Sequence, residues 1–204
     1  MRDNATTADT ATIGAGLAAG ESIRWAPRIR VDKYDDDATA WVARKTGLAV
    51  PTGAELERHV KPYETVEKAG NLLTTAGLNR LTALLIGAGG TAVTNTTARI
   101  GVGNSSTAAA VGQTDLQASA GSTNRWFQVM DATYPLQANG VVTLRSTFAT
   151  GDGNFVWSEV GTDVATATVA SGNTVGTLLL NRFVQALGTK ASGSWVLTET
   201  ITIS

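Results

Sequence analysis

The chain has 204 residues, a formal net charge of −1, no cysteine and one histidine. These values exclude a globally basic surface for nucleic acid, disulfide bonds, thiolate metal sites and a multi-histidine metal cluster within one chain. Because 43% of the residues are hydrophobic, the chain can bury a core, and its length suits one domain with an appendage.

Neither a membrane span nor a signal peptide is predicted. The longest apolar run, Leu81–Ile86, is far shorter than the ~20 residues that cross a bilayer. The first residues lack the charged and then apolar layout of a signal peptide. We therefore expect a soluble protein made in a cytoplasm, with no membrane partner and no direct contact with nucleic acid.

Residues 1–31 are predicted to form an extended N-terminal arm. Met1–Gly20 consists mainly of Ala, Thr, Gly and Asp, with Ile13 and Leu17 as its apolar anchors. This composition cannot offset the entropy of ordering by itself, so the segment is either a flexible tail or an arm that folds on a neighbour. We favour the arm.

The alternation within Ser22–Val31 is typical of a β-strand with a basic face. From Ile23 to Val31 the odd-numbered residues are apolar, whereas three even-numbered residues are arginines. Pro27 favours an edge position. Since the net charge is close to zero, the arginines are interpreted as a solvated or protein-binding face rather than a nucleic-acid site. The candidate partner-binding residues are Ile13, Leu17, Ile23, Arg24, Trp25, Arg28 and Arg30.

Residues 32–70 are predicted to be a linker region that carries two short helices. Asp32–Asp37 resembles half of a calcium loop, but it lacks the glycine and the closing glutamate. Helix capping is the simpler interpretation, with Asp37 preceding a helix over Ala38–Lys45 that ends at Gly47. No metal site is therefore predicted.

A second short helix is expected over Gly53–Val60, because Thr52 and Glu55 form a capping-box pattern. His59 falls in this helix among charged residues and has no serine, cysteine or aspartate partner in view, which indicates a surface histidine. Lys61–Lys68 is predicted to be a linker.

Residues 71–204 are predicted to form a helix followed by an antiparallel β-sandwich, jelly-roll-like in character. Thr74 or Thr75 can cap a helix that runs to about Ile86, and a leucine stripe on it is assigned to the core. That stripe consists of Leu78, Leu81, Leu84 and Leu85. Strand patterns separated by turn residues follow at Arg125–Thr133, Val141–Phe148, Phe155–Gly161, Leu178–Gln185 and Trp195–Ile203. The fold class is therefore mainly β with a few short helices.

The run Ile100–Ser105 invites comparison with a phosphate-binding loop, because it contains Gly-x-Gly. It lacks the third glycine and a Gly-Lys-Ser/Thr ending. A short strand that runs into a turn is the better interpretation.

Two carboxylates, Glu159 and Glu199, fall on apolar faces of predicted strands. Paired carboxylates can serve acid–base hydrolysis, but buried carboxylates also require a partner for stability. We favour ion pairing with an arginine, and the candidates are Arg125, Arg145 and Arg182. No catalytic, cofactor-binding or metal-binding residue is predicted.

Several segments together resemble structural proteins of tailed bacteriophages, with related proteins among actinobacterial phages. They are Gly70–Gly77, Ile100–Ala108, Thr114–Gln117, Phe155–Gly161, Leu179–Arg182 and Gly193–Thr200. The resemblance spans roughly residues 70–204, and Val31–Glu64 is similar to the N-terminal part of such proteins. It implies a virion surface protein and offers no catalytic residues to carry over.

The expected function is that of a non-enzymatic capsid decoration, or cement, protein on the capsid surface of a virion assembled in the host cytoplasm. Its arm would bind the assembled shell of the major capsid protein, and the chain would self-associate, most simply as a trimer. A tail baseplate or fibre component is the alternative. A carbohydrate-binding or glycosidase module is a third interpretation, with Trp126, Trp157, Glu159 and Glu199 in a sugar cleft.

Overall fold

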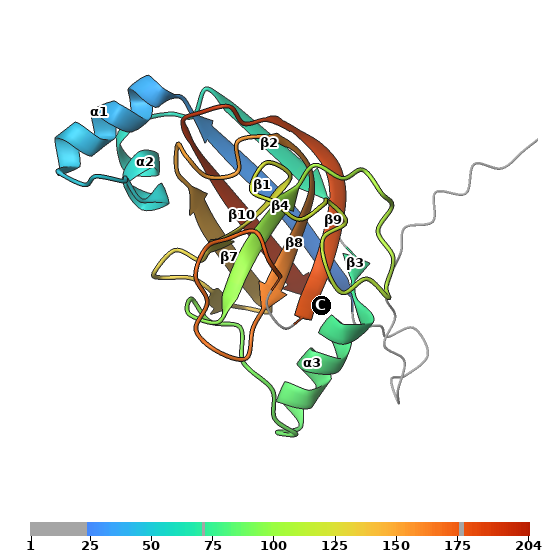
Figure 1. The fold of residues 1–204 in the computed structure, drawn as a ribbon. Helices are drawn as coiled ribbons and strands as arrows, with labels where there is room; N and C mark the ends of the chain where they lie inside the picture. The colour runs from blue at the N-terminus through green and yellow to red at the C-terminus, as the bar shows by residue number, and fades with distance from the viewer. Residues whose placement is uncertain (1–23, 71, 176–177) are drawn as a thin grey trace, which may run out of the picture.

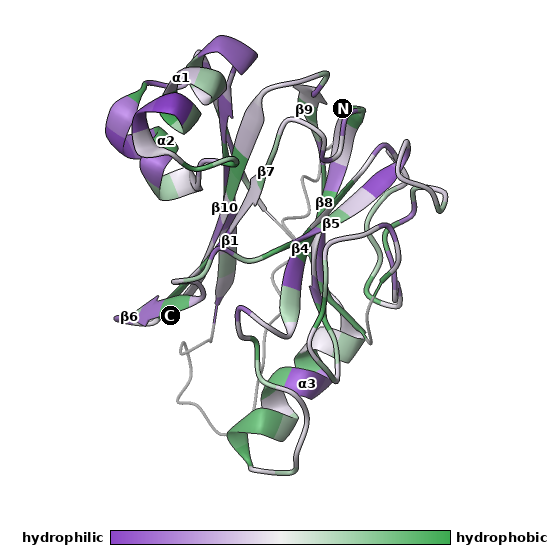
Figure 2. Ribbon diagram, turned by 60° about the vertical axis from the view of Figure 1, so that its left-hand side comes forward, coloured by the Kyte–Doolittle hydropathy of each residue, from purple (hydrophilic) through white to green (hydrophobic). Residues whose placement is uncertain are grey.

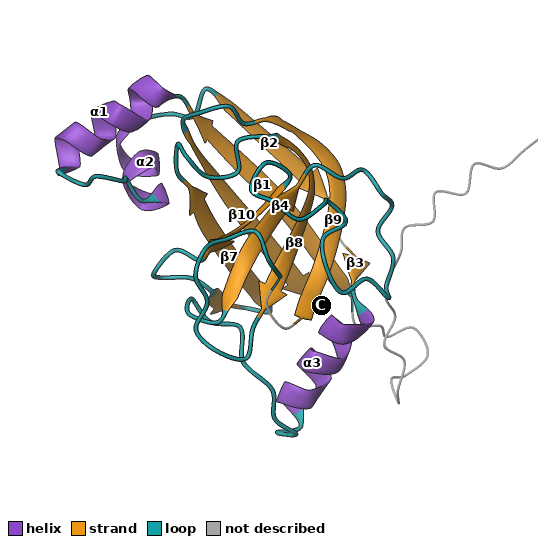
Figure 3. Cartoon of the chain, in the orientation of Figure 1, coloured by secondary structure: helices purple, strands orange, loops and turns teal. Residues whose placement is uncertain are grey.

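The computed structural model describes residues 24–70, 72–175 and 178–204, which form two five-stranded antiparallel sheets packed as a β-sandwich (Figure 1, Figure 3). The first sheet has the order β2-β1-β10-β7-β6 and the second β3-β9-β8-β4-β5. The strands are β1 (Trp25–Tyr34), β2 (Glu64–Ala69), β3 (Leu72–Leu73), β4 (Ala98–Gly103), β5 (Arg125–Val129), β6 (Leu136–Ala138), β7 (Val141–Phe148), β8 (Val156–Val164), β9 (Leu178–Thr189) and β10 (Ser194–Ile203). The helices are α1 (Asp36–Thr46), α2 (Gly53–His59) and α3 (Thr75–Leu85). The predicted fold class is confirmed in that the chain is mainly β, with a few short helices and an antiparallel β-sandwich.

The main core lies between the two sheets, because alternate residues of each strand point to the same face. Ile29 of β1 and Leu197 of β10 meet Ile100 of β4 and Val160 of β8 in one buried cluster. Three aromatic rings stack edge to face within it, with centroids 4.7 Å apart for Phe148–Trp157 and 4.8 Å apart for Trp157–Trp195. This geometry is favourable for aromatic pairs beyond the area they bury.

Residues 25–31 belong to the first sheet, so the prediction that they form part of an extended arm is wrong. β1 pairs with β10 along its whole length and with β2 from Arg28 to Lys33. The predicted edge position is also wrong. Pro27 is tolerated because it lies one residue beyond the β1–β2 pairs, where its carbonyl accepts a hydrogen bond from Gly70 N. The alternation itself is confirmed, because Ile29 is buried and Arg28 is exposed.

Both short helices of residues 32–70 are present, and their local signals act nearly as predicted. The N-cap of α1 is Asp35 rather than Asp37, and its carboxylate accepts a hydrogen bond from Ala38 N at 2.7 Å. Gly47 ends α1 in the left-handed conformation, with φ +72°. The Thr52 hydroxyl caps α2 by accepting a hydrogen bond from Glu55 N at 3.2 Å.

The two helices pack on one end of the first sheet and are not a free linker. Val42 of α1 and Leu56 of α2 form a small buried cluster with Tyr34 and Val196. The predicted linker Lys61–Lys68 is wrong for its second half, because Glu64–Ala69 is strand β2. Its side chains are mostly exposed, so pairing with β1 rather than its own composition makes it a strand.

Helix α3 lies at the end of the sandwich opposite α1 and α2 (Figure 1), and Figure 2 shows that it is the more hydrophobic helix. The Thr74 hydroxyl accepts from Gly77 N at 2.9 Å and donates to Leu179 O at 2.6 Å, which ties the helix start to β9. Leu78 packs against the core, but Leu85 is 84% exposed. The core assignment of the leucine stripe is therefore wrong for Leu85, because α3 covers only an open end.

Candidate partner-binding surface

Loops cover the outer face of the second sheet, and buried arginines hold them there. Arg182 of β9 donates to Thr107 O at 2.8 Å. Arg99 of β4 donates to Ala170 O at 2.8 Å and to Thr174 O at 2.9 Å. Residues 104–124 and 165–175 are thus anchored to this face, which leaves little of it for a partner.

Glu159 and Arg182 form a fully buried ion pair in this region, as the sequence predicted for Glu159. Arg182 Nε lies 2.6 Å from a Glu159 carboxylate oxygen, and both side chains are 0% exposed. The same carboxylate accepts hydrogen bonds from the backbone N–H groups of Gln117 (3.0 Å) and Ala118 (2.7 Å). Glu159 therefore anchors the loop after β4.

The Gly-x-Gly pattern in β4 is explained by packing. A Cβ at Gly101 would meet the Phe127 ring at 2.5 Å, and one at Gly103 would overlap the Glu159 carboxylate. Both glycines allow these side chains to approach the strand closely. The interpretation as a strand is confirmed, and the glycines have a structural reason.

Glu199 occupies a different network, between the two sheets. Its carboxylate accepts from the Thr162 hydroxyl and from the Asn181 side-chain amide, both at 2.6 Å. Glu159 and Glu199 are both 0% exposed and lie on opposite sides of the second sheet, so they do not flank one cleft. Trp157 is also 0% exposed and is not available to stack on a sugar. This arrangement favours the structural interpretation of both carboxylates.

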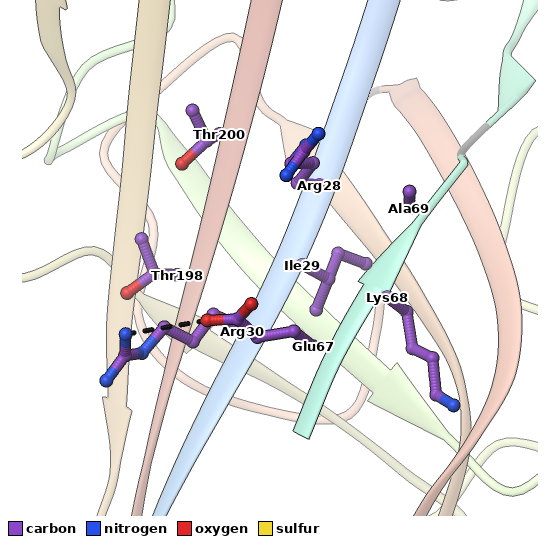
Figure 4. A pocket seen from close by; sticks show the side chains of 8 residues that line it. All are labelled: Arg28, Ile29, Arg30, Glu67, Lys68, Ala69, Thr198 and Thr200. Atoms are coloured by element: carbon purple, nitrogen blue, oxygen red, sulfur yellow. Dashed lines mark ion pairs between the residues drawn. The ribbon is translucent and has the colours of Figure 1, made fainter. Parts of the chain in front are cut away.

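The outer face of the first sheet, in contrast, is covered only by α1 and α2 among the residues that the structure describes. A shallow hollow of about 390 Å³ follows β1, β2 and β10 and includes Arg28, Arg30, Glu67, Thr198 and Thr200 (Figure 4). Arg30 pairs with Asp32 at 2.7 Å and with Glu67 at 3.5 Å. We call the area formed by Arg28, Arg30, Thr198 and Thr200 the β1–β10 face.

A second hollow of about 430 Å³ adjoins this face and shares Arg30 and Thr198 with it. Its floor includes Arg145, which is paired with Glu57 at 2.9 Å and with Asp131 at 2.8 Å. Burial raises the pKa of Asp131 above its ordinary value, although Arg145 acts in the opposite direction. The two hollows together make one surface that carries several guanidinium groups.

The structure brings only some of the predicted partner-binding residues together. Arg28 and Arg30 lie on the β1–β10 face, whereas Trp25 lies on the other side of β1. Arg24 is held by reciprocal backbone hydrogen bonds with Ser204. Ile13, Leu17 and Ile23 lie outside the described residues.

Sequence reasoning missed the contribution of Thr198 and Thr200. The available signal was that every second residue of the last strand, from Thr198 to Thr202, is a threonine. A row of this kind indicates one polar face of a half-buried strand.

Acidic residues of the run before α1 accept hydrogen bonds that stabilise the fold. Asp32 accepts hydrogen bonds from Arg30 and from the Thr65 hydroxyl, and Asp35 caps α1. Within residues 24–70, 72–175 and 178–204, no three His, Cys, Asp or Glu side chains are grouped to hold a metal ion.

In the same ranges, no helix is long and apolar enough to cross a membrane. His59 is partly exposed and lies 3.2 Å from the Glu55 carboxylate.

Comparisons of this chain with protein-family models, with curated proteins and with solved structures gave no match. The function is therefore inferred from the β1–β10 face and from the sequence resemblance.

Proposed function

We propose that this protein is a non-enzymatic virion structural protein that decorates the assembled capsid of a tailed bacteriophage. The observation that carries the proposal is the open β1–β10 face, since the outer face of the other sheet is covered by its own loops. The resemblance of residues 70–204 to phage structural proteins supplies the class of partner.

The composition of the face suits a partner that is met after folding. Non-obligate interfaces are about as polar as the rest of a protein surface, and arginine is enriched among the residues that carry binding energy. Arg28 is exposed, and Arg30 keeps a half-exposed side chain although it is paired. We assign these two guanidinium groups to contacts with carboxylates or backbone carbonyls of the major capsid protein.

The mechanism would be that of cement. A protein that binds only the assembled shell, and not its dissociated subunits, stabilises the assembled state by mass action. Self-association around a symmetry axis, most simply as a trimer, would place several β1–β10 faces on one capsid position. The oligomer would then bind the shell tightly although each single contact is weak, because the second and third contacts form within one complex.

Localisation on the particle tests the proposal. A gold-binding tag at Ser204 is imaged by electron microscopy on intact virions. Label spread over the icosahedral head is the expected result. Label confined to the tail would replace the cement function with that of a baseplate or fibre component, and the absence of label from particles would overturn both.

A further inference from the structure

An apolar groove of about 290 Å³ opens between the first sheet and α3, at the end of the sandwich where α3 lies. Nearly all of its lining is hydrophobic, including Trp25, Leu81, Leu84, Leu136, Val142 and Ile203. Leu136 is 49% exposed and Ile203 is 43% exposed, so the groove presents apolar surface to solvent. Contiguous exposed apolar surface usually marks a place where another segment or protein binds.

Trp25 provides a second and independent sign that the groove accommodates a polypeptide. Its indole Nε1 atom is buried, yet it donates to no acceptor in the part of the chain that the structure describes. Buried donors are nearly always satisfied, and leaving one without an acceptor costs free energy. Turning the indole toward the groove would bring Nε1 to its surface, where a backbone carbonyl of a bound segment would accept this hydrogen bond.

The chain itself enters the fold at the rim of the groove. Arg24 exchanges two backbone hydrogen bonds with Ser204, at 2.6 Å and 3.2 Å, which fixes the strand just before Trp25. Arg24, where the described part of the chain begins, therefore lies beside the groove. Ile13 and Leu17 are the apolar anchors of Met1–Gly20 and are spaced four residues apart.

Seven residues, 18–24, separate Leu17 from Trp25, and an extended stretch of this length spans up to about 25 Å. That reach allows Leu17 to return to the groove from the rim. Tethering also gives the segment a local concentration in the millimolar range, which favours it over a segment from another molecule.

We propose that the groove binds the N-terminal segment of the same chain, with Ile13 and Leu17 against Leu81 and Leu84 and a backbone carbonyl of the segment accepting from Trp25 Nε1. This inference concerns the isolated protein and does not depend on the proposed capsid function.

The absence of cysteine from the natural chain makes the test direct. Full-length protein with Leu17→Cys and Leu84→Cys is oxidised mildly at low concentration, and the products are separated on non-reducing gels and mapped by mass spectrometry. The expected result is an intramolecular disulfide that forms at least tenfold faster than in the matched variant with Leu17→Cys and Leu85→Cys. Leu85 is the next residue on α3, and its side chain is exposed outside the groove.

A second measurement uses the single variant Leu84→Cys and the rate at which maleimide labels its thiol. Adding Ile13→Asp and Leu17→Asp should accelerate this labelling several-fold and leave the labelling of a Leu85→Cys variant unchanged. Predominantly intermolecular disulfides would overturn the proposal in favour of exchange between copies. Equal disulfide rates at positions 84 and 85, together with unchanged maleimide labelling, would show that the segment does not bind there.

Discussion

Arg182 lies opposite Gly161 on the neighbouring strand and reaches diagonally to Glu159, with which it makes a 2.6 Å ion pair that no solvent reaches. The pair also organises a loop, because Glu159 binds two backbone N–H groups and Arg182 binds carbonyl oxygens of the same loop. A buried pair of this kind need not stabilise a fold relative to apolar residues, but the loss of one partner is costly.

The substitution Arg182→Leu should therefore destabilise the protein by about 3–5 kcal/mol, because it leaves the Glu159 carboxylate buried without its cation. Urea unfolding measures this loss. Adding Glu159→Gln removes the uncompensated charge, so the double variant should be more stable than the sum of the two single effects predicts. Strict additivity would show that the two side chains act independently.

The substitution Gly103→Ala should destabilise the fold by about 1–3 kcal/mol, as overpacking in a core does. A Cβ at this position would overlap the Glu159 carboxylate and approach the Ala118 side chain at 2.9 Å. Gly112→Ala is the matched control, since a Cβ there meets nothing within 4 Å. Thermal unfolding of the two variants compares them, and equal midpoints would contradict the packing explanation.

Lys190 should make the free energy of unfolding depend on pH in the alkaline range. Its ammonium group donates to Ala149 O and to Asn154 Oδ1, both at 2.8 Å, and burial lowers its pKa to about 8 from an ordinary 10.5. Between these two values the unfolded chain binds more protons than the folded chain, so this lysine makes the folded state more stable as pH rises through the window. Below pH 8 the full cost of burying the charge is present.

The free energy of unfolding of the natural protein is compared with that of the variant Lys190→Met. Both are measured by urea unfolding at pH 7.5, 9 and 10.5. The stability of the natural protein relative to the variant should increase across that series. Tyr34, whose pKa burial raises to about 12, affects both proteins equally and cancels. A difference that stays constant with pH would mean that the ammonium group is well solvated.

On the proposed capsid function, Arg28→Glu should weaken binding to undecorated capsids at least tenfold and change unfolding stability by no more than about 0.5 kcal/mol, because the side chain is exposed. Co-sedimentation with capsid shells measures the binding. Arg44→Glu, an equal charge change on the exposed last turn of α1, is the control and should bind normally. Equal losses in both variants would indicate a general charge effect instead of a contact at the β1–β10 face.

Local signals allowed the helices to be predicted, because their determinants are neighbours in sequence. Thr52 and Thr74 cap α2 and α3 through hydrogen bonds to residues three positions away. By contrast, β2 was missed because Glu64–Ala69 is charged and exposed, and it becomes a strand only through pairing with β1. Propensity cannot indicate a strand whose stability comes from its partner.

The site was predictable only in part for a similar reason. The alternation that places Arg28 and Arg30 on one face is local, so it could be predicted from Ser22–Val31. That this face remains open while the other sheet is covered depends on contacts such as Arg99 to Ala170, which join residues 71 positions apart. The choice of Arg182 among three candidate arginines for Glu159 likewise depended on the register of β8 and β9.

The pairing of β1 with β10 has a consequence for biosynthesis. β10 lies between β1 and β7, so the first sheet cannot close until a strand that begins 160 residues after Tyr34 has left the ribosome. Until then β1 lacks its partner β10, and Ile29 and Val31 lack the core residues that β10 supplies. Folds governed by such distant contacts form slowly, and their incomplete chains are prone to aggregate. We therefore expect translation that stops before Ser194 to yield an insoluble product, with the demand for chaperones greatest until β10 has been made.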